Sequence, residues 1–462
     1  MPADQPNILF IITDQQRWDA LGCVGGWAKT PNLDALAERS LRFDRCITNS
    51  PVCVPARLCM LTGRYPHNTG VWFNCRHTVP PETPTWCQAI RDAGYRTALF
   101  GKTHWHPHGG DLRDREDLLH AYGFDDVREA TGPRASARCK SHMTDDWEAA
   151  GLWKAYREDY NERFANDPQV VRPSALPEDL YYDGWVGEQA RRYIEAYDRD
   201  QPWFCYVGFP GPHEPWDTPE PWAGAHEPAD MPPPRPFPTE RANDRPRGVL
   251  DDMPDDARLR QDHPDRARKL RADYADNVAL IDDRVGRILQ TIEQRGELDN
   301  TVVLFTSDHG EMNGDAGLVY KANFLDGAVR VPMLLHAPGG AAGVVDHPVE
   351  LNDVGPTLAE LAGASIDHQQ FAVSLAPLTR DPRARLREDA LSEISGEVML
   401  VNDRWKIALN REGRAYLLFD LAHDPDETTN LAGDPDRAAD ADALRLRILE
   451  RIVQTQERRD TP

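Results

Sequence analysis

Four apolar runs of strand length recur along the chain, and each one is followed by polar residues. They are residues 7–14 (NILFIITD), 96–100 (RTALF), 203–209 (WFCYVGF) and 301–308 (TVVLFTSD). A continuous apolar run fits a strand that is buried on both faces of a parallel sheet. Between the runs, apolar residues recur at helical spacing. The alternation predicts an α/β fold with a large mixed, mostly parallel sheet sandwiched by helices.

Polar side chains follow each of these predicted strands. A single polar residue at a strand end is usually a cap or a loop residue. Sheets of this kind, however, bind their ligands at the carboxyl ends of the strands, so the whole set is expected on one rim. The residues are Asp14, Gln15, Lys102, His104, His213, Asp308 and His309.

The pattern changes past about residue 370. Residues 397–410 (EVMLVNDRWKIALN) and 414–421 (RAYLLFDL) predict short antiparallel strands, and residues 437–459 predict one amphipathic helix. We therefore expect a main α/β domain over residues 1–370. A C-terminal α+β subdomain, a small antiparallel sheet plus a helix, is expected over residues 371–462.

Three local expectations can be tested against a structure. The less regular stretches 105–180 and 214–260 are predicted to form loops over the rim, where substrate choice would reside. Asn32 is predicted to cap the helix that follows the first strand. The histidines His106 and His108 of the run KTHWHPHGG are interpreted as exposed or substrate-loop residues, with a zinc site as the alternative.

Charge and cysteine content limit the partners and the compartment. The 462-residue chain has a formal net charge of −23, which disfavours nucleic acid and anionic membrane as partners. No stretch reaches the roughly 18 apolar residues needed to span a bilayer, and the first residues lack the pattern of a signal peptide. The eight cysteines show no C-x-x-C spacing, which argues against a disulfide scaffold and against a thiol-redox pair. These features predict a cytoplasmic protein.

Cys53 lies in the stretch SPVCVPARLCMLTGRYP, residues 50–66. Pro55 favours the first turn of a helix and Gly63 suits its end, so Cys53 is predicted just before a helix N-terminus. Free N–H groups and the helix dipole favour an anion at that position. Arg57 would lie one turn further along and add a fixed cation.

Here the residues carry a resemblance. The pattern Cys53-Val-Pro55-Ala-Arg57 followed by Leu-Thr-Gly-Arg at 61–64 resembles the signature of the type I sulfatases, within the alkaline phosphatase superfamily. Further segments resemble that family in the same order along nearly the whole chain. They are residues 6–16, 30–43, 101–104 (GKTH), 212–216 (PHEPW), 306–311 (TSDHGE) and 419–432.

The resemblance implies an alkaline phosphatase-like fold, a sulfatase catalytic domain over residues 1–370 and hydrolysis of a sulfate monoester. It implies that a separate maturation enzyme oxidises Cys53 to formylglycine, which is the nucleophile once hydrated. One divalent metal, Ca²⁺ or Mn²⁺, would be held by Asp14, Gln15, Asp308, His309 and the modified Cys53. Arg57 and Lys102 would steady the formylglycine oxygens, His104 would be the base that releases sulfate, and His213 and Lys321 would contact the sulfate or the leaving-group oxygen.

Two positions depart from the commonest sulfatase pattern. Many sulfatases carry Asp-Asp where this chain has Asp14-Gln15, and Asp-Asn where it has Asp308-His309. Both changes resemble the branch that contains phosphonate monoester hydrolases and choline sulfatases. A phosphonate monoester or phosphodiester hydrolase is therefore the alternative function, and a metal-binding protein without turnover is a more distant one. No sequence signal indicates the organic part of the substrate or the oligomeric state.

Overall fold

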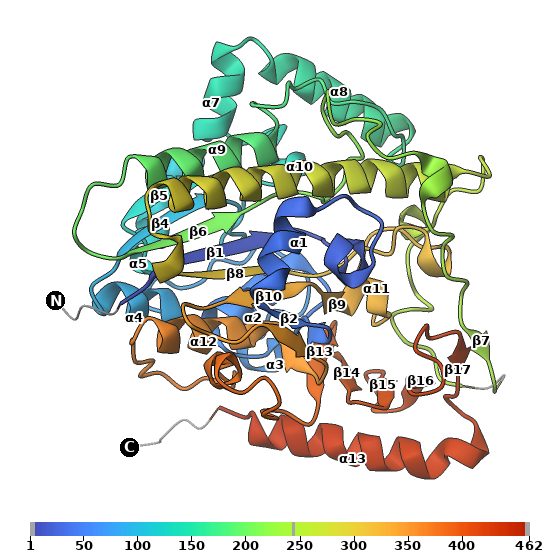
Figure 1. Cartoon of the computed structure of the whole chain (residues 1–462). Helices are drawn as coiled ribbons and strands as arrows, with labels where there is room; N and C mark the ends of the chain where they lie inside the picture. Colours follow the sequence, from blue (N-terminus) through green and yellow to red (C-terminus); the bar gives the residue numbers. More distant parts are fainter. Residues whose placement is uncertain (1–4, 243–244, 458–462) are drawn as a thin grey trace.

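The computed structural model describes residues 5–242 and 245–457. An eight-stranded sheet forms its centre, in the order β11-β2-β10-β8-β1-β6-β4-β5 (Figure 1). The strands are β1 (Asn7–Thr13), β2 (Leu41–Phe43), β4 (Arg96–Gly101), β5 (Asp126–Glu129), β6 (Trp203–Gly208), β8 (Thr301–Ser307), β10 (Met333–His336) and β11 (Gly343–Val345).

The four predicted strands are adjacent in this sheet and parallel to one another. Strand β1 pairs with β6 on one side and with β8 on the other, and β4 pairs with β6. Only β10 runs antiparallel to its neighbours β8 and β2. All six residues of β6 and all seven of β8 are buried, which explains their continuous apolar sequence. The predicted mixed, mostly parallel sheet is therefore confirmed.

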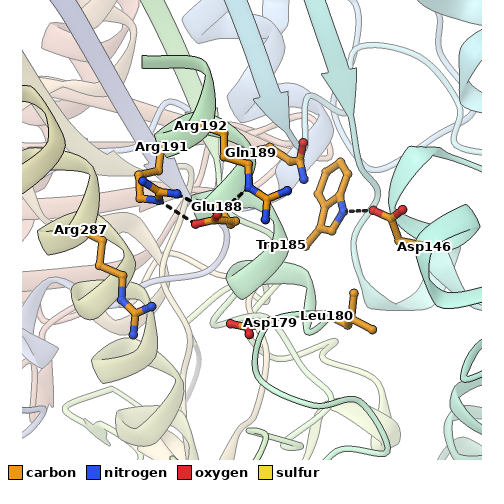
Figure 2. Close-up of a pocket in the computed structure, with 9 residues that line it drawn as sticks. All are labelled: Asp146, Asp179, Leu180, Trp185, Glu188, Gln189, Arg191, Arg192 and Arg287. Atoms are coloured by element: carbon orange, nitrogen blue, oxygen red, sulfur yellow. Dashed lines mark hydrogen bonds and ion pairs between the residues drawn. The ribbon is translucent and has the colours of Figure 1, made fainter. Parts of the chain in front are cut away.

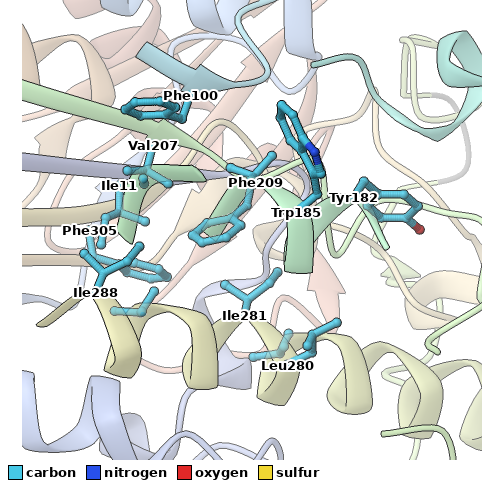
Figure 3. Packing of buried hydrophobic residues seen from close by; sticks show 14 of the residues in the cluster. Ile11, Phe100, Tyr182, Trp185, Val207, Phe209, Leu280, Ile281, Ile288 and Phe305 are labelled. Atoms are coloured by element: carbon cyan, nitrogen blue, oxygen red, sulfur yellow. The ribbon is translucent and has the colours of Figure 1, made fainter. Parts of the chain in front are cut away.

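Helices cover both faces of the sheet (Figure 1). On one face α9 (Tyr182–Glu195), α10 (Arg266–Gln294) and α1 (Pro31–Glu38) pack on the sheet. Figure 3 shows this core, in which Ile11, Val207 and Phe305 of the strands meet Ile281 and Ile288 of α10. The opposite face carries α2 (Cys53–Thr62), α4 (Trp86–Asp92), α5 (Glu116–Ala121) and α12 (Val354–Leu361).

The C-terminal region forms the expected small antiparallel sheet, which has four strands. Its strands are β13 (Ala390–Ile394), β14 (Glu397–Val401), β15 (Trp405–Leu409) and β16 (Ala415–Asp420). Helix α13 (Ala438–Gln454) covers one face through Leu444 and Ile448, and the other face packs on Phe324 and its neighbours. Residues 458–459 of the predicted terminal helix lie outside the described residues.

Two short sheets complete the strand set. One contains β3 (Cys46–Ile47), β9 (Arg330–Val331) and β12 (Val349–Glu350). The other pairs β7 (Thr239–Glu240) with β17 (Thr429–Asn430), so the stretch after residue 214 contacts the C-terminal region.

The prediction of loops over residues 105–180 is wrong. This stretch contains α5, α6 (Pro133–Ser136), α7 (His142–Ala149) and α8 (Trp153–Asn166) as well as strand β5. Helix α8 contacts the segment that follows His213, because Arg163 Nη1 donates a hydrogen bond of 3.4 Å to the backbone oxygen of Trp216. The stretch 214–260 is mostly irregular where it is described, as expected. In the described part of the chain, no helix has both the length and the hydropathy that crossing a membrane requires.

Candidate functional site

The carboxyl ends of β1, β4, β6 and β8 meet on one edge of the sheet because these strands are parallel neighbours. Asp14 follows β1 directly, Lys102 follows β4, and Asp308 follows β8. His213 lies five residues beyond the end of β6. Four distant segments therefore supply one site, as the sequence predicted.

Helix α2 brings Cys53 to this edge. Val52 is the N-cap, so the helix begins at Cys53 itself and not just after it, which corrects the prediction by one residue. Pro55 lies in the first turn, and Gly63 ends the helix with a left-handed φ of 67°. All ten residues of α2 are buried, so Cys53 is fixed at the positive end of a rigid helix.

Four potential ligand side chains converge around Cys53. The donor atoms of Asp14, Cys53, Asp308 and His309 all lie within 4.8 Å of one another. Cys53 Sγ is 3.1 Å from His309 Nε2 and 3.6 Å from Asp14 Oδ1. His309 Nε2 is 3.6 Å from Asp308 Oδ1. Each of these four residues is almost completely buried.

Cationic side chains surround the two carboxylates. Lys102 Nζ forms an ion pair with Asp14, and Arg57 Nε donates a hydrogen bond of 2.7 Å to Asp308 Oδ2. Arg57 Nη1 donates to the backbone oxygen of Lys102 at 2.9 Å. Arg57 Nη2 is buried and has no hydrogen-bond partner among the described residues. A buried, unpaired guanidinium N–H beside the cluster is suited to an oxygen atom of a ligand.

The electrostatics of the cluster fix its protonation. Burial opposes ionisation of Asp14, but the charges of Lys102 and Arg57 hold the pKa of its carboxyl well below the usual range. Burial also opposes charge on His309, and Asp308 with Cys53 nevertheless raises the pKa of this histidine to about 9. The site therefore keeps an anionic Asp14 at neutral pH and favours a positive charge beside Asp14 and Asp308, either the proton of His309 or a metal ion in its place.

A second group lies between the ends of β1 and β6. Lys321, from the loop between η7 (Asp315–Gly317) and α11 (Asp326–Val329), donates a hydrogen bond to Gln15 Oε1. Its Nζ is also 3.0 Å from His213 Nε2. His213 Nδ1 is 2.8 Å from the backbone oxygen of Glu214. Burial lowers the pKa of His213 to about 4, and Lys321 lowers it in the same direction, so His213 is neutral at pH 7.

His104 lies on the open side of the site. Its side chain is partly exposed, and its backbone φ is 65°. Nδ1 of His104 is enclosed and has no hydrogen-bond partner in the part of the chain that is described. Burial and the charge of Lys102 lower the pKa of His104 well below the usual value. A neutral imidazole with a free nitrogen can accept a proton.

Two carboxylates in the site were missed by sequence reasoning. Gln15 Nε2 donates a hydrogen bond of 2.9 Å to Glu214 Oε2 and a second one to Glu311. In this structure the Gln15 amide is thus engaged by Lys321, Glu214 and Glu311, and its role as a metal ligand stays a prediction. Burial raises the pKa of Glu311 to about 7. Their positions, next to His213 and two residues after His309, were the available signal.

A surface hollow of about 460 Å³ lies elsewhere, over the outer side of α9 (Figure 2). Charged side chains line it, and Glu188 accepts hydrogen bonds from Arg191 and Arg192 within it. Trp185 Nε1 donates to Asp146 Oδ2 at 2.7 Å. None of the residues of the rim site lines this hollow.

Comparison with known proteins identifies the family. A family model described as Sulfatase matches residues 6–364. The chain belongs to the sulfatase family. This sulfatase is 30% identical over 461 residues to the choline-sulfatase of Rhizobium meliloti (strain 1021). The aligned region covers 94% of this chain and 84% of that protein. It is 28% identical over 491 residues to the arylsulfatase of Clostridium perfringens (strain 13 / Type A), covering 98% of this chain and 95% of the relative.

Solved structures agree on the fold. The phosphonate monoester hydrolase of Agrobacterium radiobacter superposes with a TM-score of 0.77 at 25% identity, covering 98% of this sulfatase and 96% of that chain. The alkaline phosphatase-like architecture expected from the sequence is confirmed. With named sulfatases as its relatives, the protein is an enzyme of the sulfuric ester hydrolase class.

The residues present fit a divalent metal. Two carboxylates and one imidazole converge at full burial, and the adjacent Arg57 Nη2 makes no hydrogen bond to any residue that the structure describes. Without a metal ion, Asp14 and Asp308 rely on Lys102, Arg57 and a protonated His309 for charge compensation. A mixed oxygen and nitrogen donor set suits Mn²⁺ or a similar ion better than Ca²⁺, which prefers oxygen alone.

Proposed function

We propose that this enzyme hydrolyses a sulfate monoester to an alcohol and inorganic sulfate, with a formylglycine made from Cys53 as the nucleophile. One observation carries the proposal. Cys53 Sγ lies at the N-terminus of a buried helix, 3.1 Å from His309 Nε2 and 3.6 Å from Asp14 Oδ1. The cations Lys102 and Arg57 pair with the carboxylates beside it. A group at this position is held by the metal ligands on one side and faces the rim on the other.

The divalent metal and the formylglycine would each contribute a separate chemical function to the reaction. A divalent metal bound by Asp14, Asp308 and His309, with Gln15 as a further predicted ligand, would polarise the oxygens that bind to it. A hydrated formylglycine at position 53 would supply two hydroxyls, one to attack sulfur and one whose deprotonation expels sulfate. Formation of formylglycine requires a separate maturation enzyme as a partner.

The side chains of this enzyme divide the remaining tasks. Arg57, through its unpaired Nη2, and Lys102 stabilise negative charge on the oxygens beside position 53. Neutral His104 accepts the proton that is lost when sulfate leaves. Lys321, 3.0 Å from His213 Nε2, is positioned with that histidine to contact the sulfate and give a proton to the departing alcohol oxygen.

Local cations also explain how an acidic protein binds an anion. The chain carries a net charge of −23, which repels anions at long range. Arg57, Lys102 and Lys321 are nevertheless buried in the site, where their interaction with an anion is poorly screened by water. Attraction of the substrate is therefore a local property of the rim.

A phosphonate monoester or phosphodiester hydrolase is the second candidate. The structural similarity to the phosphonate monoester hydrolase of Agrobacterium radiobacter favours it, together with Gln15 and His309. Sulfate monoesters and phosphonate monoesters are both monoanions with a tetrahedral centre, so the cations of the site accept either. The order of preference must be measured.

The deciding experiment compares kcat/KM for an aryl sulfate and for an aryl phosphonate monoester with the same leaving group. Both rates are measured on one preparation in which conversion of Cys53 is quantified by peptide mass. We expect the sulfate to be preferred by several orders of magnitude. A preference for the phosphonate or for a phosphodiester would replace the proposed function with the second candidate.

A further inference from the structure

A second group of potential metal ligands lies behind the catalytic rim. His106, His108 and Glu129 bring their ligand atoms within 4.8 Å of one another. Glu129 is the last residue of β5, and both histidines belong to the segment that follows β4. The three side chains are 0%, 4% and 1% exposed, so the histidines are not solvent-exposed, and their interpretation as substrate-loop residues stays a prediction.

The distances from the carboxylate oxygens to the two histidine nitrogens lie on either side of the separation expected in a metal tetrahedron. Glu129 Oε2 is 2.8 Å from His106 Nε2, and Glu129 Oε1 is 3.5 Å from His108 Nε2. Ligands at about 2.0–2.1 Å from a tetrahedral zinc ion are separated by about 3.3 Å. The rings of the two histidines lie at 70° to each other with centroids 5.5 Å apart, so both nitrogens face the carboxylate without stacking.

Hydrogen bonding leaves this group incomplete. His106 Nδ1 is 3.3 Å from the backbone oxygen of Pro107, the contact that assigns the proton to Nδ1 and the lone pair to Nε2 in metal-bound histidines. A lone pair on Nε2 then faces an anionic oxygen at 2.8 Å, and a cation or a proton must lie between them. A proton there satisfies His106 alone. His108 Nε2 stays buried without a hydrogen-bond partner in the described chain.

A further contact fixes the carboxylate. Glu129 accepts a hydrogen bond from Thr103 Oγ1, which holds the carboxylate in position. Two imidazoles and one carboxylate form a donor set typical of zinc.

We propose that His106, His108 and Glu129 bind a second divalent ion of the zinc class, separate from the ion at Asp14, Asp308 and His309. The ion ties the segment after β4 to the end of β5. That segment also carries His104, whose ring stacks on His108 with centroids 4.9 Å apart and planes at 21°. The second ion therefore has a positioning role for His104 and takes no part in the bond-breaking steps.

Metal content and ligation test the proposal directly. The apoprotein is loaded with Zn²⁺, unbound metal is removed, and the bound metal is counted by mass spectrometry of the elements. We expect two equivalents in the wild type and one in the His106→Gln/His108→Gln variant, whose remaining affinity at this site falls by more than about 100-fold. His142→Gln is the matched control, since His142 Nε2 pairs with Glu116 at 3.2 Å and no second histidine joins them. It should keep both equivalents.

A second readout reports the coordination of the bound ion. Co²⁺ is bound to the wild type and to Asp308→Asn, which lacks a ligand of the first site. We expect the visible spectrum of a tetrahedral ion with imidazole ligands in both proteins, and its loss when Glu129→Gln is combined with Asp308→Asn. One equivalent of metal in the wild type, with the same amount in the double histidine variant, would overturn the proposal and leave a proton between His106 and Glu129.

Discussion

Position 53 has the properties that a nucleophile needs in a closed site. It is 2% exposed, it begins a rigid helix, and it lies within contact distance of two predicted metal ligands. We predict that Cys53→Ala lowers kcat by a factor on the order of 10⁴ or more while the melting temperature stays nearly unchanged. Steady-state kinetics and a thermal melt measure the two effects.

Cys59 provides the matched control on the same helix. It is completely buried but faces the core, so Cys59→Ala should cost about 1 kcal/mol of stability and leave kcat unaltered. Unmodified thiol at Cys53 in active protein, produced together with a working maturation enzyme, would contradict the nucleophile assignment.

Substitution of His104 distinguishes the two steps of the reaction, which are release of the alcohol and release of sulfate. If it accepts the proton when sulfate leaves, His104→Asn should release one equivalent of alcohol in a burst and then turn over about 10²–10⁴ times more slowly than the wild type. Rapid quenching measures the burst, and intact mass shows the sulfated protein that accumulates. His213→Asn is the contrasting variant, because it should slow alcohol release itself. A low rate without a burst in His104→Asn would assign the histidine to the first step.

Most residues of the site could be predicted from the sequence because they follow predicted strands. The others were found only from contacts between distant segments of the folded chain. Asp14, Lys102, Asp308 and His309 were expected together because each follows a predicted strand of one parallel sheet. Glu129 lies at the end of a four-residue strand in which three residues are not fully buried, so no apolar run marked it. Glu214 and Glu311 act through Gln15, a contact across almost 200 and 300 positions that no local pattern contains.

At the scale of elements, strong apolar patterns were sufficient to predict helices and strands from the sequence, and weak patterns were not. Helix α8 was missed because six of its fourteen residues are charged and it buries only Tyr156, Tyr160 and Arg163. Asn32 does not cap α1. The helix begins at Pro31 after Thr30, and Asn32 Nδ2 instead donates a hydrogen bond of 2.8 Å to Asp282 of α10. Helix packing decided this position, and a single sequence window does not show it.

One short element gives a pH-dependent contribution to stability. His67 of α3 (Pro66–Thr69) places Nδ1 2.6 Å from Glu393 Oε1 of β13. Burial opposes charge on His67, and the hydrogen bond to Glu393 outweighs it and raises the pKa of this histidine. A histidine whose pKa is raised in the folded state stabilises the folded protein fully below its unfolded pKa of about 6.5. This contribution to the free energy of unfolding is lost as pH rises through the folded pKa.

We therefore predict that His67→Gln lowers the free energy of unfolding by about 1–2 kcal/mol at pH 5.5 and by much less at pH 8.5. Urea unfolding of the wild type and the variant at both pH values measures the difference. The exposed His263 serves as a control position, where the same substitution should change stability little. An equal loss at both pH values would mean that His67 acts through packing on Tyr65 alone.

At the scale of the whole molecule, the C-terminal sheet is bound to the catalytic part by buried charges as well as by apolar packing. Lys406 of β15, completely buried, forms ion pairs with Asp326 of α11 and with Glu427. Arg451 of α13 donates hydrogen bonds to Glu350 and to Tyr65 of the catalytic part. Removing one partner of a buried ion pair costs about 3–5 kcal/mol, because the other charge stays buried and unpaired.

The boundary expected near residue 370 separates two regions of the sequence. We therefore predict that the two regions fold together as one cooperative unit. A chain that ends at residue 370 would expose the apolar residues Ile47, Val52 and Phe324. It would also deprive Glu350 of Arg451, and Asp326 of Lys406. We expect it to aggregate or to lack a cooperative transition, whereas the full chain should unfold in urea with coincident circular dichroism and tryptophan fluorescence curves. A soluble truncated chain with its own cooperative transition would show instead that the catalytic part folds alone. In that case the ion pairs of Lys406 and Arg451 would join two independently stable units.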